Sequence, residues 1–148
     1  MDTRIYTATA SVLLKPVSAF RHPQCRVNGQ DIILDKETWF DITFNGLRDT
    51  TAKIQVEHIN KNCDENLIQP GTDIAIIVEQ IKLNEITSPK FIWQGVYTPN
   101  YPTHFQNPPT DPLVGHNYLG WDGVWSLEFT LPVYTWVHRV ENLGWIYD

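Results

Sequence analysis

Four acidic or amide side chains in the middle of the chain could bind a metal ion. Glu57 and Asn60 stand at the end of a predicted strand, Asp64 lies with Glu65 in the polar loop that follows, and Asp73 precedes the next apolar segment. Calcium takes about six to eight oxygen ligands, and such a loop can supply several of them. The alternative, which the local sequence favours, is a solvated acidic loop in which Asp73 caps a turn by accepting backbone N–H groups.

Aromatic and polar side chains gather farther along, in and beside a turn-rich loop that we expect from Thr98 to Asp122. Flat tyrosine and tryptophan rings can stack on sugars, and nearby polar side chains can form directional hydrogen bonds. The residues expected at such a ligand site are Tyr97, Tyr101, His116, Asn117, Tyr118, Trp121 and Asp122. The alternative is that the same aromatic side chains are buried against neighbouring subunits.

The sequence contains none of the short motifs that mark common enzyme active sites. GxSxG, GxGxxG, HExxH and P-loop patterns do not occur, and the five histidines are scattered along the chain. No spacing places two carboxylates across a cleft, as glycoside hydrolysis requires. We therefore expect a protein that is not an enzyme.

Charge and hydrophobicity argue against two classes of partner. The 148 residues carry a formal net charge of −6 without a basic cluster, so we expect no nucleic-acid binding. No apolar run reaches membrane-spanning length, and the N-terminus lacks the apolar segment of a signal peptide. We expect no membrane insertion and no export by the ordinary secretory route.

Alternation of apolar and polar residues predicts β-strands along almost the whole chain. Asn28-Gly29 lies between two such segments and is typical of a type I′ hairpin turn. A nearly continuous apolar run from Ile74 to Val78 indicates a strand that is covered on both faces. Residues 90–97 and most of residues 124–140 are also expected to be strands, and no window shows a convincing helical period.

The elements predict a single all-β domain over residues 1–148, folded as an antiparallel β-sandwich of jelly-roll type, with a barrel as the alternative. Residues 1–97 would supply lectin-like strands, residues 98–122 a proline-rich loop, and residues 123–148 a C-terminal strand and an aromatic tail. Cys25 and Cys63 match no zinc-binding spacing. We expect buried free thiols, and a disulfide between the two is the alternative.

The segment VEHINK, the acidic loop after it and the strand TDIAIIVEQIKLN resemble the calcium-dependent xylan-binding type of carbohydrate-binding module. The resemblance covers about a third of the chain, from Val27 to Ile86, and implies a β-sandwich that binds polysaccharide. The implied calcium ligands are Glu57, Asn60, Asp64 and Asp73. The chain departs from the family pattern in its longer acidic loop and in Lys61, which stands where an aspartate is expected.

The C-terminal half, from FIWQGVYTPNYP to VENLGWIYD, resembles small virion-associated proteins of tailed phages, particularly those that infect marine cyanobacteria. This resemblance implies a non-enzymatic structural protein of the virion, in a capsid decoration or tail, assembled in the host cytoplasm. Its partners would be other virion proteins or further copies of itself, and a host-surface polysaccharide would be its attachment target. The alternative function is a stand-alone calcium-dependent polysaccharide-binding module.

Overall fold

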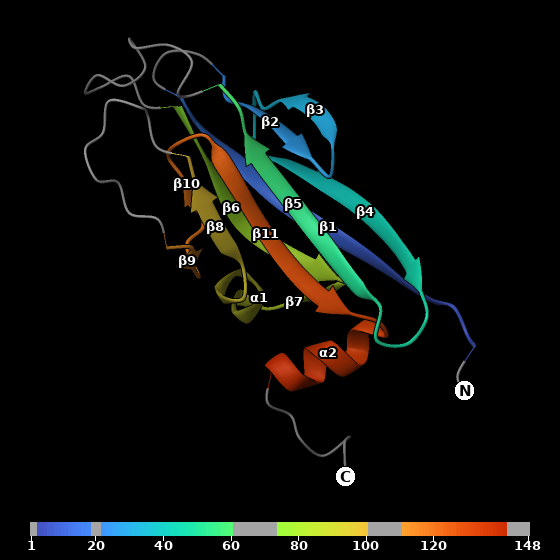
Figure 1. Ribbon diagram of the computed structural model, residues 1–148. Helices are drawn as coiled ribbons and strands as arrows, with labels where there is room; N and C mark the ends of the chain where they lie inside the picture. Colours follow the sequence, from blue (N-terminus) through green and yellow to red (C-terminus); the bar gives the residue numbers. More distant parts are fainter. Residues whose placement is uncertain (1–2, 19–21, 61–73, 101–110, 142–148) are drawn as a thin grey trace.

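The strands form two antiparallel β-sheets (Figure 1), and alternating apolar residues of both sheets form the core. The computed structural model describes residues 3–18, 22–60, 74–100 and 111–141. The first sheet contains, in spatial order, β10 (Tyr118–Leu119), β6 (Ile74–Leu83), β1 (Tyr6–Ser18) and β4 (Thr38–Gly46), with β7 (Ile86–Thr87) paired to β6. The second contains β3 (Gln30–Ile33), β2 (Gln24–Val27), β5 (Thr51–His58), β11 (Gly123–Thr130), β8 (Val96–Pro99) and β9 (Leu113–Val114). The predicted antiparallel β-sandwich is confirmed.

Two asparagine turns fix the register of neighbouring strands. Asn28 and Gly29 adopt φ values of 47° and 85° between β2 and β3, which confirms the predicted hairpin turn. The Asn28 side chain also reaches β5, where Oδ1 accepts a hydrogen bond from the backbone N–H of Gln55 at 2.7 Å. Asn84, between β6 and β7, has a φ of 48°, and its Oδ1 accepts from the Thr9 backbone N–H at 2.8 Å. Each turn is therefore tied to a strand outside its own hairpin.

The core is built from the apolar side chains that alternate along the strands. Trp125 and Phe129 on β11 are buried, and Ile54 and Val56 on β5 lie on the same inner side of the second sheet. Trp125 has no exposed surface and pairs with Val56 on one side and with Tyr97 on the other. Alternation along antiparallel strands is enough to place these side chains, because period two separates the two faces of a strand.

The strand predicted over residues 90–97 is wrong at its beginning, because the chain forms a short helix, α1 (Pro89–Trp93), before β8. Ser88 precedes the helix, and its hydroxyl accepts a hydrogen bond from the Lys90 backbone N–H at 3.2 Å. Pro89 occupies the first turn, where its missing N–H costs nothing. Phe91 is buried while Trp93 is 58% exposed, so the apolar run is divided between core and surface.

A second correction concerns residues 124–140, in which the strand stops at Thr130 and α2 (Val133–Val140) follows. Val133 and Val137 are buried, and Trp136 and Val140 pack against the core at the same helical spacing. Phe91 of α1 and Trp136 of α2 have ring centroids 5.8 Å apart, so both helices close one end of the sandwich (Figure 1). Neither helix in the described residues is long and apolar enough to span a membrane.

Cys25 is a free cysteine on β2 with no exposed surface. Burial raises the pKa of its thiol to about 12, so the thiol stays protonated at neutral pH. The prediction of a buried free thiol is confirmed for Cys25, while Cys63 lies outside the described residues.

Gly95 allows the chain to leave α1 across the face of the Trp125 ring. A Cβ atom at this position would lie 2.6 Å from Cε2 and 2.7 Å from Nε1 of Trp125. We expect Gly95→Ala to lower the free energy of unfolding by about 1–3 kcal/mol, because the added methyl group overpacks the core. Urea denaturation followed by circular dichroism measures this loss.

The control is the same substitution in a Trp125→Phe background, which lacks Nε1 and the fused ring. There the penalty of Gly95→Ala should shrink, since the clashing atoms are gone. Additivity of the two substitutions within about 0.5 kcal/mol would contradict the contact.

Candidate functional site

A pocket of about 430 Å³ opens beside β6, where β7, α1 and the segment before β10 meet. Its apolar wall comes from Pro89, Ile92 and Trp93 of α1. The remaining lining residues, most of them polar, are Glu79, Gln80, Thr87, Ser88, Gly115 and Asn117. The arrangement combines one aromatic wall with several hydrogen-bonding side chains, as in sites that bind small polar ligands.

The backbone around α1 holds Trp93 at the rim of this pocket. The Gly115 N–H donates a hydrogen bond to the Gly95 carbonyl at 2.8 Å, which ties the segment after β9 to the residue that follows α1. Gly115 has a φ of 76°, a left-handed conformation that favours glycine. Trp93 is 58% exposed even though both flanking segments are fixed, so its indole forms a surface open to a ligand.

A β-bulge in β6 turns two consecutive side chains toward the pocket. Leu13 on β1 pairs with Gln80 and Leu14 pairs with Val78, so Glu79 is the extra residue on β6. A bulge breaks the strict alternation of faces and re-aims the bulged side chain. Glu79 and Gln80 both line the pocket, whereas their neighbours Val78 and Ile81 are buried in the core.

Asn117, which also lines the pocket, is fixed by two hydrogen bonds to β6. Its Nδ2 donates to the Val78 carbonyl at 3.0 Å, and its own carbonyl accepts from the Val78 N–H at 2.9 Å. Asn117 thus continues the pairing of β10 with β6 by one residue. The carboxamide is positioned before any ligand arrives, which lowers the entropy cost of binding.

A larger groove, of about 690 Å³, lies over the outer face of the second sheet. It crosses β5, β11 and β8, and it is bordered by both Glu57 and Asp122. Its other polar lining residues are Lys53, Gln55, His58, Thr98, Asn100 and Ser126. The apolar residues Ile59, Pro99 and Val124 also line the groove, and among the described lining residues there is no tryptophan, tyrosine or phenylalanine.

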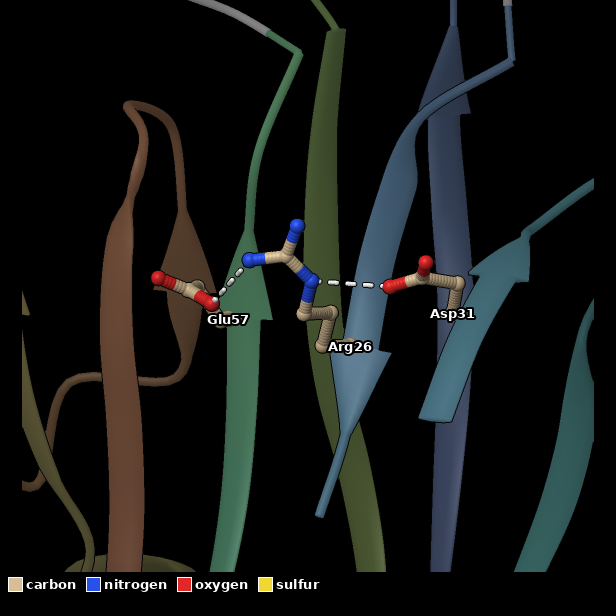
Figure 2. Close-up of polar contacts among 3 residues, drawn as sticks. All are labelled: Arg26, Asp31 and Glu57. Carbon is tan, nitrogen blue, oxygen red and sulfur yellow. Dashed lines mark hydrogen bonds and ion pairs between the residues drawn. The ribbon is translucent and has the colours of Figure 1, made fainter. Parts of the chain in front are cut away.

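Arg26 sits between two carboxylates beside this groove (Figure 2). Its Nε donates to Asp31 at 2.8 Å and one terminal nitrogen donates to Glu57 at 3.2 Å. The strand register places Arg26 directly opposite both residues, on β3 and β5. The hydrogen bonds with Asp31 and then with Glu57 raise the pKa of Arg26. The Arg26 guanidinium is therefore the positive charge that neutralises Glu57, which is the role that a bound calcium ion would have at this carboxylate.

The two described residues of the predicted calcium site have partners within the protein. Glu57 is bonded to Arg26, and Asn60 is 5% exposed with its Oδ1 accepting from the Gln24 N–H at 2.9 Å. Asp64 and Asp73 lie outside the described residues. Among the residues that the structure describes, no three histidine, cysteine, aspartate or glutamate side chains form a group suited to a metal.

Three of the predicted ligand residues do come together, but as a structural cluster. The Tyr97 hydroxyl donates to the Trp121 carbonyl and accepts from the Trp121 N–H, and the His116 ring stacks on Tyr97 at 5.6 Å and 11°. Tyr97 is only 2% exposed, so its expected position on the surface is wrong. It occupies an inward position of β8, where the alternation of the strand buries it.

The other predicted ligand residues are dispersed. Asn117 lines the pocket, Asp122 lines the groove, and Tyr118 is 38% exposed on β10, while Tyr101 lies outside the described residues. The loop expected from Thr98 to Asp122 is not structureless where it is described, since it contains β9 and β10. Backbone pairing of these short strands separates residues that are close in sequence.

The sequence analysis missed Trp93, Glu79 and Gln80, which the structure brings to one pocket. Trp93 was expected on a strand because Phe91 to Trp93 are all apolar. The signal that could have corrected this is Ser88-Pro89, which is typical of a helix N-terminus. The bulge at Glu79 leaves no comparable sequence signal.

Two solved structures resemble the chain at low identity, while no family model and no curated protein matches it. One is vCBM60 in complex with galactobiose, with a TM-score of 0.45 and 19% identity over 80% of this chain and 96% of that one. The other is the selenomethionine form of vCBM60, described with two families of calcium-dependent carbohydrate-binding modules linked by circular permutation. It has a TM-score of 0.44 and 18% identity, over 81% of this chain and 89% of that one. At these TM-scores and identities the likeness does not assign the chain to a family.

The Tyr97 hydroxyl should contribute to stability through its two hydrogen bonds to the Trp121 backbone. We expect Tyr97→Phe to lower the free energy of unfolding by about 1–3 kcal/mol, because it leaves backbone groups without their partner. Tyr134→Phe is the matched control, since Tyr134 is 52% exposed, and it should change stability by less than about 0.5 kcal/mol. Equal effects of the two substitutions in urea denaturation would contradict a supporting role for Tyr97.

Proposed function

We propose that the chain is a non-catalytic carbohydrate-binding domain and that the pocket beside Trp93 is its sugar-binding site. The observation that carries the proposal is an indole, 58% exposed, at the rim of a pocket whose other walls bear a carboxylate and two carboxamides. A sugar ring has an apolar face that can stack on an indole and hydroxyl groups that both donate and accept hydrogen bonds.

The polar groups of the pocket include both the hydrogen-bond donors and the hydrogen-bond acceptors that sugar hydroxyl groups require. Glu79 offers acceptors only, whereas Gln80 and Asn117 have carboxamides that contain donors and acceptors. The Asn117 carboxamide is already held against β6, and the backbone bond between Gly115 and Gly95 holds the segment beside Trp93. A site that is preformed in this way spends less of its binding energy on ordering its own side chains.

We further propose that the protein is part of a phage particle. This proposal rests on the resemblance of the C-terminal half to virion-associated proteins of tailed phages. In that setting the pocket would attach a virion to a host-surface polysaccharide. Trp93 and Val114 are 58% and 74% exposed, and they favour one other role, which is packing against a neighbouring virion subunit or a second copy. Binding and self-association measured on the same variants separate the two roles.

Trp93→Ala should weaken binding to a responsive glycan by about tenfold or more, because a stacked aromatic anchor commonly contributes over 1.4 kcal/mol. A glycan array identifies the ligand, and isothermal titration calorimetry measures the change. Tyr134→Ala is the control, since Tyr134 is an exposed aromatic residue on α2 and should leave binding unchanged.

Two results would count against this function. If Trp93→Ala leaves glycan binding unchanged, the sugar-binding site is not the pocket beside Trp93. A wild-type protein that binds no glycan, and that self-associates in sedimentation only while Trp93 is present, would favour the subunit-packing role.

Calcium dependence is a proposal that rests on Asp64 and Asp73, the two loop carboxylates. We expect calcium to raise the unfolding midpoint relative to chelator, because a ligand bound only by the native state stabilises it. Asp73→Asn should abolish the rise, whereas Glu57→Gln should preserve it, since Arg26 already pairs with Glu57. Equal midpoints in millimolar calcium and in chelator would remove calcium from the proposal.

A further inference from the structure

We propose that Glu79 makes the pocket beside Trp93 selective for sugars that carry a protonated amine, and that it disfavours sugars that carry a carboxylate. The inference rests on the proposed function and adds the charge class of the ligand. Glu79 is the only ionisable residue among the described residues that line the pocket. Among these lining residues its carboxylate is the charged group that a ligand meets, and its ion-pair partner Lys15 lies outside the lining.

The bulge in β6 explains why this carboxylate faces the ligand. Glu79 is the extra residue between the pairs Leu14–Val78 and Leu13–Gln80. At such a bulge, side chains no longer alternate strictly between the two faces of the strand. Glu79 and Gln80 then lie side by side along one wall of the pocket. The backbone pairing of β1 with β6 on both sides of the bulge fixes this wall.

The ion pair that Glu79 makes within the protein is weak and can be exchanged. Lys15 Nζ lies 3.9 Å from Glu79 Oε1, and the two side chains are 50% and 30% exposed. A charge-assisted hydrogen bond is shorter, at about 2.7–2.9 Å, and exposed ion pairs contribute little to stability. The ammonium group of an amino sugar in the pocket can therefore replace Lys15 at small cost, whereas the carboxylate of a uronic acid would be repelled by Glu79, the charged residue of the lining.

The experiment compares three oligosaccharides of equal length and linkage by isothermal titration calorimetry, at a pH that protonates the glucosamine amine. They are a glucosamine oligomer, its N-acetylated counterpart and a glucuronic acid oligomer. We expect the wild-type protein to bind the glucosamine oligomer roughly fivefold more tightly than the N-acetylated one, as a partly exposed ion pair of about 1 kcal/mol gives. The glucuronic acid oligomer should bind most weakly, and added salt should reduce these differences.

Two substitutions test the role of Glu79 itself. Glu79→Gln keeps the shape of the side chain and should make the glucosamine and N-acetylated oligomers bind equally. Lys15→Gln removes the competing ammonium and should increase the preference for glucosamine. Glu128→Gln is the control, because it makes the same change of charge on β11 of the other sheet, where Glu128 lies 3.7 Å from Lys53, and it should leave the preference unchanged.

The outcomes separate this inference from the proposed function. If the N-acetylated oligomer binds and Trp93→Ala weakens it, but Glu79→Gln leaves the preferences as they were, the role of Glu79 is overturned and the sugar site stands. A preference of the wild-type protein for the glucuronic acid oligomer would also overturn the proposed role of Glu79. If none of the three oligomers binds, or if Trp93→Ala changes nothing, the proposed sugar site fails and the inference fails with it.

Discussion

The burial of Trp125 between the sheets is the constraint on which the rest of the structure depends. This indole pairs across β11 with Val56 and Tyr97 and has no exposed surface, so both neighbouring strands are positioned against it. Its ring leaves no space for a side chain at position 95. Because residue 95 is a glycine, the chain can pass from α1 into β8 against this ring. Gly95 also accepts the hydrogen bond from Gly115, so one residue links the packing of Trp125 to a segment that lines the Trp93 pocket.

Polar residues that look available in the sequence are largely used to hold the fold. Asn60 bonds to the backbone of Gln24, Asn28 bonds to β5, and Tyr97 bonds to the backbone of Trp121. Asn60 and Tyr97 are buried and need such partners, because burying polar groups without hydrogen bonds is costly. The side chains left for a ligand include Glu79, which projects from the bulge in β6.

The two hollows on opposite sheets differ in chemistry. The groove over β5, β11 and β8 has no aromatic side chain among its described lining residues, and its Glu57 already pairs with Arg26 (Figure 2). The pocket beside β6 joins an exposed indole to a carboxylate with only a weak partner in Lys15. This difference makes the smaller pocket the better candidate for a ligand with both apolar and hydroxyl surfaces.

The sequence by itself determined the all-β class, the Asn28-Gly29 turn and the inward faces of β5 and β11, because period-two alternation and turn chemistry are local properties. The apolar pattern alone did not decide that Phe91 to Trp93 form a helix, since three consecutive apolar residues fit a strand or a helix, and only Ser88-Pro89 marks the helix start in the sequence. Only the tertiary structure decided which face each candidate residue occupies. It buried Tyr97, paired Glu57 with Arg26 and turned Glu79 outward, because strand register and bulges depend on partners that are distant in the chain.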